Sequence, residues 1–335
     1  MNGIILTPRG RQQGLSLIEL MVTLLLSSFL LLGILQLFIN SNTTDRANSA
    51  LARLQENGRI ALDMVKRDFR RTGYQGCASP DMESLERSSR TFPLDAMGDQ
   101  VEGAGTDNDT LLVRHAAPAR IRLVETFPDT TIITGPGVGF TAGERYEFVL
   151  TDCEAVAIFT ADVSAPSDNA DPATEVEFPN KYSISNLKGF NNGPAPDLST
   201  MATTEHTEFL RITEHQYAVR DDPTNNNRPT LYKGDDPMIA DVDNFQVLYG
   251  IDSNGNEPGG TINWYNGDTL NTEDLRSQVS RLQISLVMSS PDEVADQANT
   301  QAFTIANLAS NQLNAIADRR LRRAFNTVID VRNRP

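Results

Sequence analysis

This sequence contains two acid–histidine pairs whose side chains could bind a metal ion. Glu205-His206 and Glu214-His215 lie nine residues apart, and on neighbouring strands the four side chains could converge. Zinc sites use such carboxylate and imidazole ligands, together with cysteine in many structural sites. No third soft ligand stands near these pairs, so we predict no metal site here.

A second candidate for cation binding is the turn-rich segment that begins at Asp252. Asp252, Asn254 and Asn256 alternate like the first ligands of a calcium loop. However, Gly255 and Glu257 interrupt the usual spacing, and no bidentate Glu ends the segment. We therefore expect a hydrophilic hairpin turn.

Catalytic motifs are not evident in the chain. The run Gly135-Pro-Gly-Val-Gly139 contains Pro136 and precedes no helical pattern, so we expect a turn and not a dinucleotide-binding loop. The chain has three histidines and no Ser-His-Asp or Cys-His signature. We predict no catalytic residue and no cofactor. A membrane-anchored periplasmic enzyme is a remote alternative, which activity against a peptidase or esterase panel would support.

One carboxylate in an apolar run is the most informative chemical feature. From Leu15 to Ile39 the only charge is Glu19, and the run is long enough to cross a bilayer as a helix. A charge at the centre of a spanning helix costs roughly 2.5–3.5 kcal/mol on insertion scales, so Glu19 needs a functional reason. A plain anchor would not need Glu19. A secretory signal would be shorter and would end in a small-residue cleavage site.

Charge places the two ends of this run on opposite sides of a membrane. Arg9 and Arg11 precede it, and the first basic residue after it is Arg46. The positive-inside bias then puts the N-terminus in the cytoplasm and the bulk of the chain outside. The net charge is −15, and it becomes −17 if the two leader arginines are removed. That balance argues against a nucleic-acid partner, which needs a basic surface.

A helical pattern continues beyond the apolar run. Apolar residues recur at spacings of three and four from Leu51 to Phe69, and Thr72-Gly73 is a suitable stop. The sequence predicts one helix over residues 15–72, about 87 Å long at 1.5 Å per residue. The alternative is two helices broken near Asn40–Thr44.

Beyond Gly76 the pattern changes to short strands and long loops. We predict strands over 110–114, 120–124, 147–150, 155–159, 208–212, 216–220, 245–251, 279–288 and 324–331. The pair 147–150 and 155–159 has the spacing of a hairpin. Segments 79–108, 161–200 and 221–238 are rich in Pro, Asp, Asn and Gly and are expected to be surface loops.

The N-terminal pattern resembles the cleavage and methylation signal of type IV prepilins. A basic leader ends at Gly14, a hydrophobic residue follows, and Glu19 would be the fifth mature residue. The family usually has Phe at the first mature position, where this chain has Leu15. The resemblance implies that a prepilin peptidase cuts between Gly14 and Leu15, that Leu15 is N-methylated, and that Glu19 docks the subunit by pairing with a neighbour's N-terminal amine.

More specific stretches resemble the PilW family of minor pilins. These are Leu54–Leu62, Arg67–Cys77, Thr151–Cys153 and Val331–Arg334. The resemblance implies a minor pilin that primes pilus assembly at or near the pilus tip, and the missing catalytic motifs predict that the chain is not an enzyme. The implied partners are other minor pilins, the major pilin, the prepilin peptidase and the inner-membrane assembly platform. The J-type minor pseudopilin of type II secretion is the alternative.

The resemblance also implies a disulfide between Cys77 and Cys153 that joins the helix end to the sheet. Both cysteines fall in the exported part, where disulfides persist. A reactive thiol is the alternative, although neither cysteine has a nearby histidine or CxxC partner.

The predicted fold is α+β and type IV pilin-like, with a long N-terminal helix packed on an antiparallel β-sheet domain. We divide the chain into a leader (1–14), a transmembrane or filament-core helix (15–39), its amphipathic continuation (40–73) and a β-rich domain (74–335). The expected location is the inner membrane with the C-terminal domain in the periplasm, and the pilus tip after assembly.

Overall fold

The structure is a computed structural model of the 335-residue chain. It describes residues 16–77, 108–117, 121–123, 131–134, 139–153, 156–166, 180–189, 194–195, 198, 207–254, 260–272, 275, 278–298, 303–304, 312–313 and 317–331. The helical elements are α1 (Leu17–Phe69), η3 (Pro223–Asn225) and α2 (Gly267–Thr272). The strands are β1 (Leu111–Ala117), β2 (Ile121–Leu123), β3 (Thr131–Thr134), β4 (Arg145–Thr151), β5 (Val156–Val163), β6 (Asn180–Gly189), β7 (Glu208–Asp222), β8 (Arg228–Lys233), β9 (Asp236–Ala240), β10 (Val242–Asp252), β11 (Ile262–Tyr265), β12 (Val279–Glu293), β13 (Phe303–Thr304), β14 (Gln312–Leu313) and β15 (Arg320–Asp330).

Helix α1 is continuous over 53 residues, or about 80 Å at 1.5 Å per residue. The prediction of a single helix is confirmed, and the alternative of a break near Asn40–Thr44 is wrong. The hydroxyls of Thr43 and Thr44 donate to the Asn40 carbonyl oxygen at 2.9 and 2.8 Å, one turn back. Polar side chains bonded in this way are compatible with a helix, and the segment contains no proline or glycine.

A glycine in a left-handed conformation follows the end of α1. The helix ends at Phe69, three residues before the predicted stop, and Gly73 follows with a φ of +76°. This left-handed conformation suits glycine, as the sequence indicated. The Gly73 amide then donates to the Arg114 carbonyl oxygen at 3.2 Å, and the Ala116 amide donates to the Tyr74 carbonyl oxygen at 2.9 Å. The segment after the helix is therefore held along β1.

The larger of the two main sheets is antiparallel and has nine strands. Its order is β2-β3-β6-β5-β4-β7-β8-β9, with β1 also paired to β7. Strand β7 is fifteen residues long. It pairs with β4 near its start, with β1 along its middle and with β8 near its end. Strand β7 thus connects the part of the sheet from β2 to β4 with the part formed by β8 and β9.

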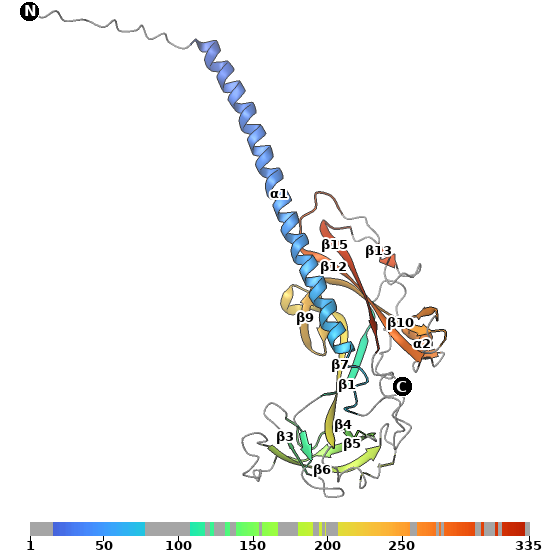
Figure 1. The fold of residues 1–335 in the computed structure, drawn as a ribbon. Helices are drawn as coiled ribbons and strands as arrows, with labels where there is room; N and C mark the ends of the chain where they lie inside the picture. Colours follow the sequence, from blue (N-terminus) through green and yellow to red (C-terminus); the bar gives the residue numbers. More distant parts are fainter. Residues whose placement is uncertain are drawn as a thin grey trace, which may run out of the picture.

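The smaller main sheet has the order β11-β10-β12-β15 and packs against the second half of α1. Strands β13 and β14 form a separate two-stranded pair. Figure 1 shows the first half of α1 as a free rod, the four-stranded sheet beside its second half, and strands β3 to β6 at the far end. The predicted fold class is confirmed: a long apolar N-terminal helix is joined to antiparallel sheets.

Two main clusters of buried side chains hold these parts together. The first contains Leu54, Val65 and Phe69 of α1 together with residues of β10 and β12, among them Phe245 and Leu286. The second lies at the far end and is rich in aromatic rings, with Phe148 and Phe209 centroids 5.0 Å apart. The first cluster includes residues from one stripe of α1, whereas the second includes no residue of α1.

Most of the predicted strands are present, and several are longer than expected. The hairpin of β4 and β5 is confirmed, and so are strands at 111–117, 121–123, 242–252, 279–293 and 320–330. The segments 208–212 and 216–220 were predicted as two strands but belong to the single strand β7. Residues 213–215, between the two predicted strands, are paired with β1. The residue pattern within 208–220 could not reveal this pairing, because β1 is distant in sequence.

Two segments predicted as surface loops contain strands. Strand β6 and the end of β5 lie within 161–200, and η3, β8 and the start of β9 lie within 221–238. In the second segment Asn226, Asn227 and Gly234 lie in turns and have positive φ. Pro237 lies on β9, which ends the strand order, and an edge strand tolerates proline. The third predicted loop, 79–108, lies almost wholly outside the described residues.

Candidate assembly interface

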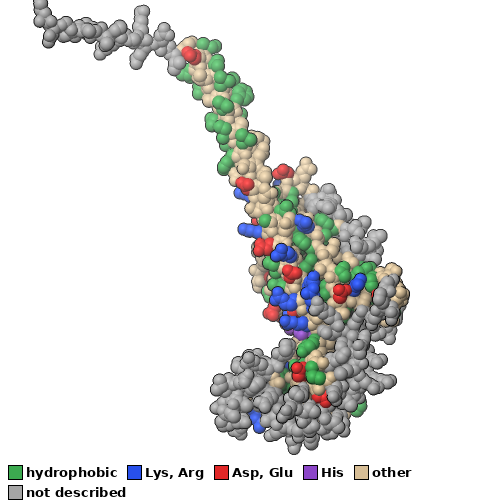
Figure 2. Space-filling model, in the orientation of Figure 1, with side chains coloured by type: hydrophobic (Ala, Val, Ile, Leu, Met, Phe, Trp, Pro, Cys, Tyr) green, Lys and Arg blue, Asp and Glu red, His purple; other side chains and the backbone are tan. Residues whose placement is uncertain are grey.

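The first half of α1 carries apolar side chains on all sides and has no cover within the described structure. Its 18-residue apolar window is 0% buried, and this helix is long and apolar enough to cross a membrane. Leu17 is 77% exposed and Phe38 is 65% exposed. Figure 2 shows hydrophobic side chains along the visible face of this half. A contiguous exposed apolar surface of this kind marks contact with lipid or with other protein chains.

Glu19 is the acidic residue in the first turn of α1, and its side chain is exposed. Ser16 precedes the helix with an extended conformation, and its carbonyl oxygen accepts from the Leu20 amide at 3.1 Å. The unpaired amides of a helix start favour a negative charge nearby. Glu19 is thus stabilised locally even though apolar residues surround it. Gly14 and Leu15, the predicted cleavage residues, lie outside the described residues.

The second half of α1 buries a single stripe. The buried residues are Ala50, Leu54, Gly58, Ala61, Val65, Asp68 and Phe69. Their spacing of three and four residues places them on one face, which packs on β12 and β15. Arginines and acids of the other face remain exposed, as the sequence predicted.

Gly58 allows the closest approach between this stripe and the sheet. A Cβ atom built on Gly58 would stand 2.4 Å from the tip of the Phe325 ring on β15. Any larger residue would require the ring or the helix to move. The glycine in the apolar stripe thus has a packing role.

Asp68 anchors the last turn of α1 to two strands. It is 9% exposed and accepts a hydrogen bond from the Tyr217 hydroxyl at 2.7 Å and another from the Lys233 ammonium. Burial raises the pKa of Asp68, but the hydrogen bonds from Lys233 and Tyr217 outweigh it and hold the pKa below its usual value. Burial and the bond to Asp68 raise the pKa of Tyr217. A charged carboxylate therefore joins the helix to β7 and β8.

Two histidines lie close to this anchor. His115 on β1 and His215 on β7 have ring centroids 6.3 Å apart. Burial is the main cause that lowers the pKa of each, and the positive charge of Lys233 contributes in both. His115 is 5% exposed, and its Nδ1 atom has no hydrogen-bond partner in the described structure. The surroundings of both rings therefore favour the neutral form.

The predicted disulfide is present between Cys77 and Cys153, which are 76 residues apart in sequence. It joins the segment after α1 to the turn between β4 and β5. The Cys77 amide also donates to the Glu208 carboxylate at 3.1 Å. On the chain-entropy model a loop of this length gives about 4–5 kcal/mol of stabilisation.

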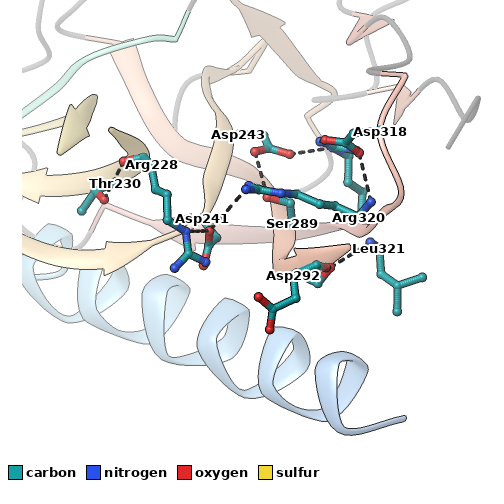
Figure 3. Close-up of polar contacts among 11 residues, drawn as sticks. Arg228, Thr230, Asp241, Asp243, Ser289, Asp292, Asp318, Arg320 and Leu321 are labelled. Carbon is teal, nitrogen blue, oxygen red and sulfur yellow. Dashed lines mark hydrogen bonds and ion pairs between the residues drawn. The ribbon is translucent and has the colours of Figure 1, made fainter. Parts of the chain in front are cut away.

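A buried cluster of ion pairs joins the two main sheets. Arg322 on β15 is 3% exposed and donates to Asp243 at 2.7 Å and to Asp318 at 2.6 Å. Asp241, in the link between β9 and β10, accepts from Arg228 of β8 at 2.7 Å. Burial raises the pKa of Asp241, against the opposing effect of Arg228. Figure 3 shows this cluster beside a helix, with the Asp292 carboxylate on the helix side.

Of the two acid–histidine pairs, only Glu214-His215 lies within the described residues. Glu214 pairs with Arg114, and His215 lies by His115, while Glu205 and His206 lie outside the described residues. Among the described residues, no group of three or more histidine, cysteine or acidic side chains could hold a metal ion.

The two turn candidates are described only in part. In the calcium-like segment, Asp252 accepts from the Asn254 amide at 3.1 Å, which is a turn contact. Asn256 is not described, and of the run 135–139 only Gly139 is described, in an exposed position.

Sequence reasoning missed the residues of the Asp68 anchor and those of the ion-pair cluster. Asp68 stands three residues after Val65, so it falls on the apolar stripe, and a charge at that position was a readable sign of a buried partner. Tyr217, Lys233, Asp243 and Arg322 carried no comparable sign, because their partners lie on distant strands.

Comparison with protein families gives two matches. Residues 9–35 match the model described as "Prokaryotic N-terminal methylation motif". Residues 216–333 match the model described as "Type IV Pilus-assembly protein W". The resemblance to the PilW family of minor pilins is confirmed by this match, most of which lies outside the stretches that first indicated it, Leu54–Leu62, Arg67–Cys77, Thr151–Cys153 and Val331–Arg334.

Comparison with individual proteins adds less. A solved structure, the type IV-like pilin TTHA1219 from Thermus thermophilus, is 14% identical over 57% of this chain and 85% of its own, with a TM-score of 0.21. That score is too low to support an argument about the fold. No curated protein matches the chain.

Proposed function

We propose that this chain, a type IV pilin-like protein of the PilW kind, is a minor pilin that primes pilus assembly and lies at or near the pilus tip. One observation carries the proposal: the first half of α1 is apolar on every side and uncovered in the described structure, while the second half buries its apolar stripe against the sheets. A helix of this form needs lipid before assembly and neighbouring helices after it.

The proposed cycle begins in the inner membrane. The prepilin peptidase cuts between Gly14 and Leu15, and the new amine of Leu15 is methylated. Glu19 lies about 6 Å along the helix from Leu15, so its carboxylate can reach the interface while the chain is in the membrane. The N-terminus faces the cytoplasm and the sheets face the periplasm. The leader (1–14), the anchor (15–39), its continuation (40–73) and the β-rich part (74–335) are the units of this proposal.

Glu19 then acts as the docking group during assembly. Inside a filament an unpaired carboxylate is costly, whereas one paired with an amine is tolerated. Pairing with the N-terminal amine of the major pilin or of another minor pilin would favour extraction from the membrane in one register. The assembly platform would supply the place where the partners meet.

Replacing Glu19 tests this role. In a strain that lacks the chromosomal copy, we expect Glu19→Ala to insert normally, since the change makes the helix more apolar, but to leave piliation near the level of the deletion strain. Membrane fractionation and counts of surface pili measure the two effects. Glu56→Ala, an exposed acid on the second half of the same helix, is the matched control and should restore pili.

Two outcomes would contradict the proposal in different ways. Full piliation by Glu19→Ala at native expression would exclude Glu19 as the docking group. Loss of type II secretion with normal pili in the deletion strain would instead support the J-type pseudopilin. The PilW match over residues 216–333 supports the pilus assignment.

N-terminal analysis of the membrane-extracted protein should find methylated Leu15, and a mature end beyond residue 39 would exclude prepilin processing.

A further inference from the structure

The outward face of the second half of α1 is basic, although the chain as a whole has a net charge of −15. From residue 53 to residue 71 the charged side chains on this face are six cations and only two acids, Glu56 and Asp63. Figure 2 shows Lys and Arg side chains along the visible part of this half. We name the six cations the basic stripe; they are Arg53, Arg59, Lys66, Arg67, Arg70 and Arg71.

The basic stripe lies opposite the apolar stripe that packs on the sheets. At 3.6 residues per turn, the five cations from Arg53 to Arg70 fall within about 140° of arc, centred on the side away from the buried residues. None of the six takes part in an ion pair among the residues that the structure describes. The helix dipole favours cations near the last turn, but Arg53 and Arg59 stand more than two turns before the helix ends. The dipole therefore does not account for the whole stripe.

The free side of the second half is where a neighbouring helix can approach. The apolar half of α1 needs apolar neighbours on every side, and the helix continues from it without a break. Along residues 50–69 the sheets cover one side of the helix. Helices that gather around the apolar half therefore find the second half free on the opposite side, which carries the basic stripe.

A second copy of this chain is a poor neighbour on that side. The pairing of Glu19 with a neighbour's N-terminal amine offsets two parallel chains by about 6 Å, the rise of four helical residues. The basic stripe is about 27 Å long, so two copies whose free sides face each other bring most of their stripes side by side. Like charges repel at such distances. Charge therefore selects a different subunit, whose helix carries carboxylates at the same height.

Two other anionic partners fit this face less well. Arg53, the cation of the stripe nearest the membrane, is about 21 Å beyond Ile39 along the helix, outside the headgroup layer of a bilayer that holds the apolar half. A nucleic acid would meet the acidic remainder of the chain, which opposes its approach. Ile60 lies within this face and is 40% exposed, which gives a protein partner an apolar contact among the charges.

We propose that the basic stripe docks the helix of a different pilin subunit, one that carries carboxylates along the continuation of its own apolar half. The contact is a set of ion pairs around Ile60, and it keeps a second copy of this chain from the same place. The stripe thereby adds a choice of partner to the register that Glu19 sets. This inference rests on assembly through the apolar half of α1 in the proposed function.

Photocrosslinking in living cells tests the proposal with the full chain. Ile60 is replaced by the photoreactive residue benzoylphenylalanine in a strain that lacks the unaltered copy, and crosslinked peptides are identified by mass spectrometry after irradiation. We expect peptides from another subunit with a prepilin signal, from the helix beyond its apolar run, with more Asp and Glu than Lys and Arg. In isolated membranes the crosslink yield should fall several-fold at high salt, because exposed ion pairs are screened.

Matched double variants locate the contact. Arg59→Glu with Arg67→Glu should lower the crosslink yield at residue 60 about tenfold, the effect of two exposed ion pairs replaced by repulsion. Arg220→Glu with Arg281→Glu makes the same change of net charge at exposed positions of β7 and β12 and should leave the yield unchanged. Urea unfolding followed by the fluorescence of Trp264 shows that each variant is folded.

Several results would overturn the inference. These are a crosslink to a second copy of this chain, a crosslink to nucleic acid or lipid, a partner peptide without an excess of carboxylates, equal yields in the two double variants, and a yield that does not respond to salt. The absence of any crosslink in cells that make pili would also overturn it. Failure of the proposed function is separate, because it would appear as absence of the chain from washed membranes or as normal pili in the deletion strain.

Discussion

The two halves of α1 differ in the shape of their apolar surface, although they belong to one unbroken helix. Residues 17–39 are apolar around the whole circumference and are covered by no described residue. Residues 50–69 carry one apolar stripe, which is buried against β12 and β15, with charged residues on the outer face. A stripe matches a neighbour on one side, whereas a full apolar surface needs an apolar environment on every side. The chain's own sheets can therefore bury the apolar stripe of the second half, whereas the first half needs lipid or other helices.

The strongest test of this difference is the same substitution in both halves. We expect Leu54→Ala, at a residue 2% exposed, to lower the free energy of unfolding by about 2–5 kcal/mol, through lost burial and a cavity. Leu24→Ala, at a residue 62% exposed, should leave it within about 0.5 kcal/mol. Urea unfolding in detergent, followed by Trp264 on β11, measures both. Equal losses would mean that the first half is also packed on the sheets.

Introducing a charge should harm the first half of α1 more than the second, the reverse of the effect expected for the alanine substitutions. Leu30→Arg lies near the middle of the apolar half and should weaken membrane insertion by about 2.5–3.5 kcal/mol. Leu51→Arg, 38% exposed on the second half, should have no such effect. The fraction retained in carbonate-washed membranes is the readout. Full retention of Leu30→Arg would show that this half does not depend on a lipid environment.

Adding one methyl group to a glycine should have opposite consequences in the two halves. Gly58→Ala places a Cβ against the Phe325 ring and should destabilise the fold by about 1–3 kcal/mol. Gly33→Ala meets nothing within 4 Å and should favour the helix slightly, by about 0.5–1 kcal/mol. The same urea experiment gives the first value, and circular dichroism in detergent gives the helical content for the second. A neutral Gly58→Ala would indicate that Phe325 moves freely.

The smallest expected effect is a pH dependence that belongs to the second half alone. Burial lowers the pKa of both His115 and His215, so the folded state favours the neutral rings. Stability is then complete above the unfolded value of about 6.5 and falls as the pH drops below it, because the unfolded chain binds protons more readily. The lowered pKa of Asp68 adds a further loss near and below pH 3.8.

A histidine variant separates this effect from general acid denaturation. The charges that face the two rings are Asp68, Lys233 and Arg71, with Glu214 and Asp236 beside His215. We expect His115→Gln to flatten the loss of stability between pH 6.5 and 5, while membrane retention stays constant over that range. If the stability of the variant has the same pH profile as that of the unaltered chain, His115 is not a source of the pH dependence.

The sequence by itself determined the features that are local along the chain. The apolar run with Glu19, the stripe from Leu54 to Phe69 and the Gly73 turn could all be read because neighbours along a helix or turn are neighbours in space. The family resemblance came from equally local motifs and was supported by independent matches at residues 9–35 and 216–333.

Only the tertiary structure decided the contacts between distant strands. Spacing could not show that residues 208–222 form one strand that pairs with β4, β1 and β8 in turn, or that residues 228–240, with two prolines and two aspartates, form a hairpin at the edge of the larger sheet. Nor could it pair Asp68 with Tyr217 and Lys233, or Arg322 with Asp243. These partners are far apart in sequence, and only the folding of α1 and the two sheets onto one another brings their charges together.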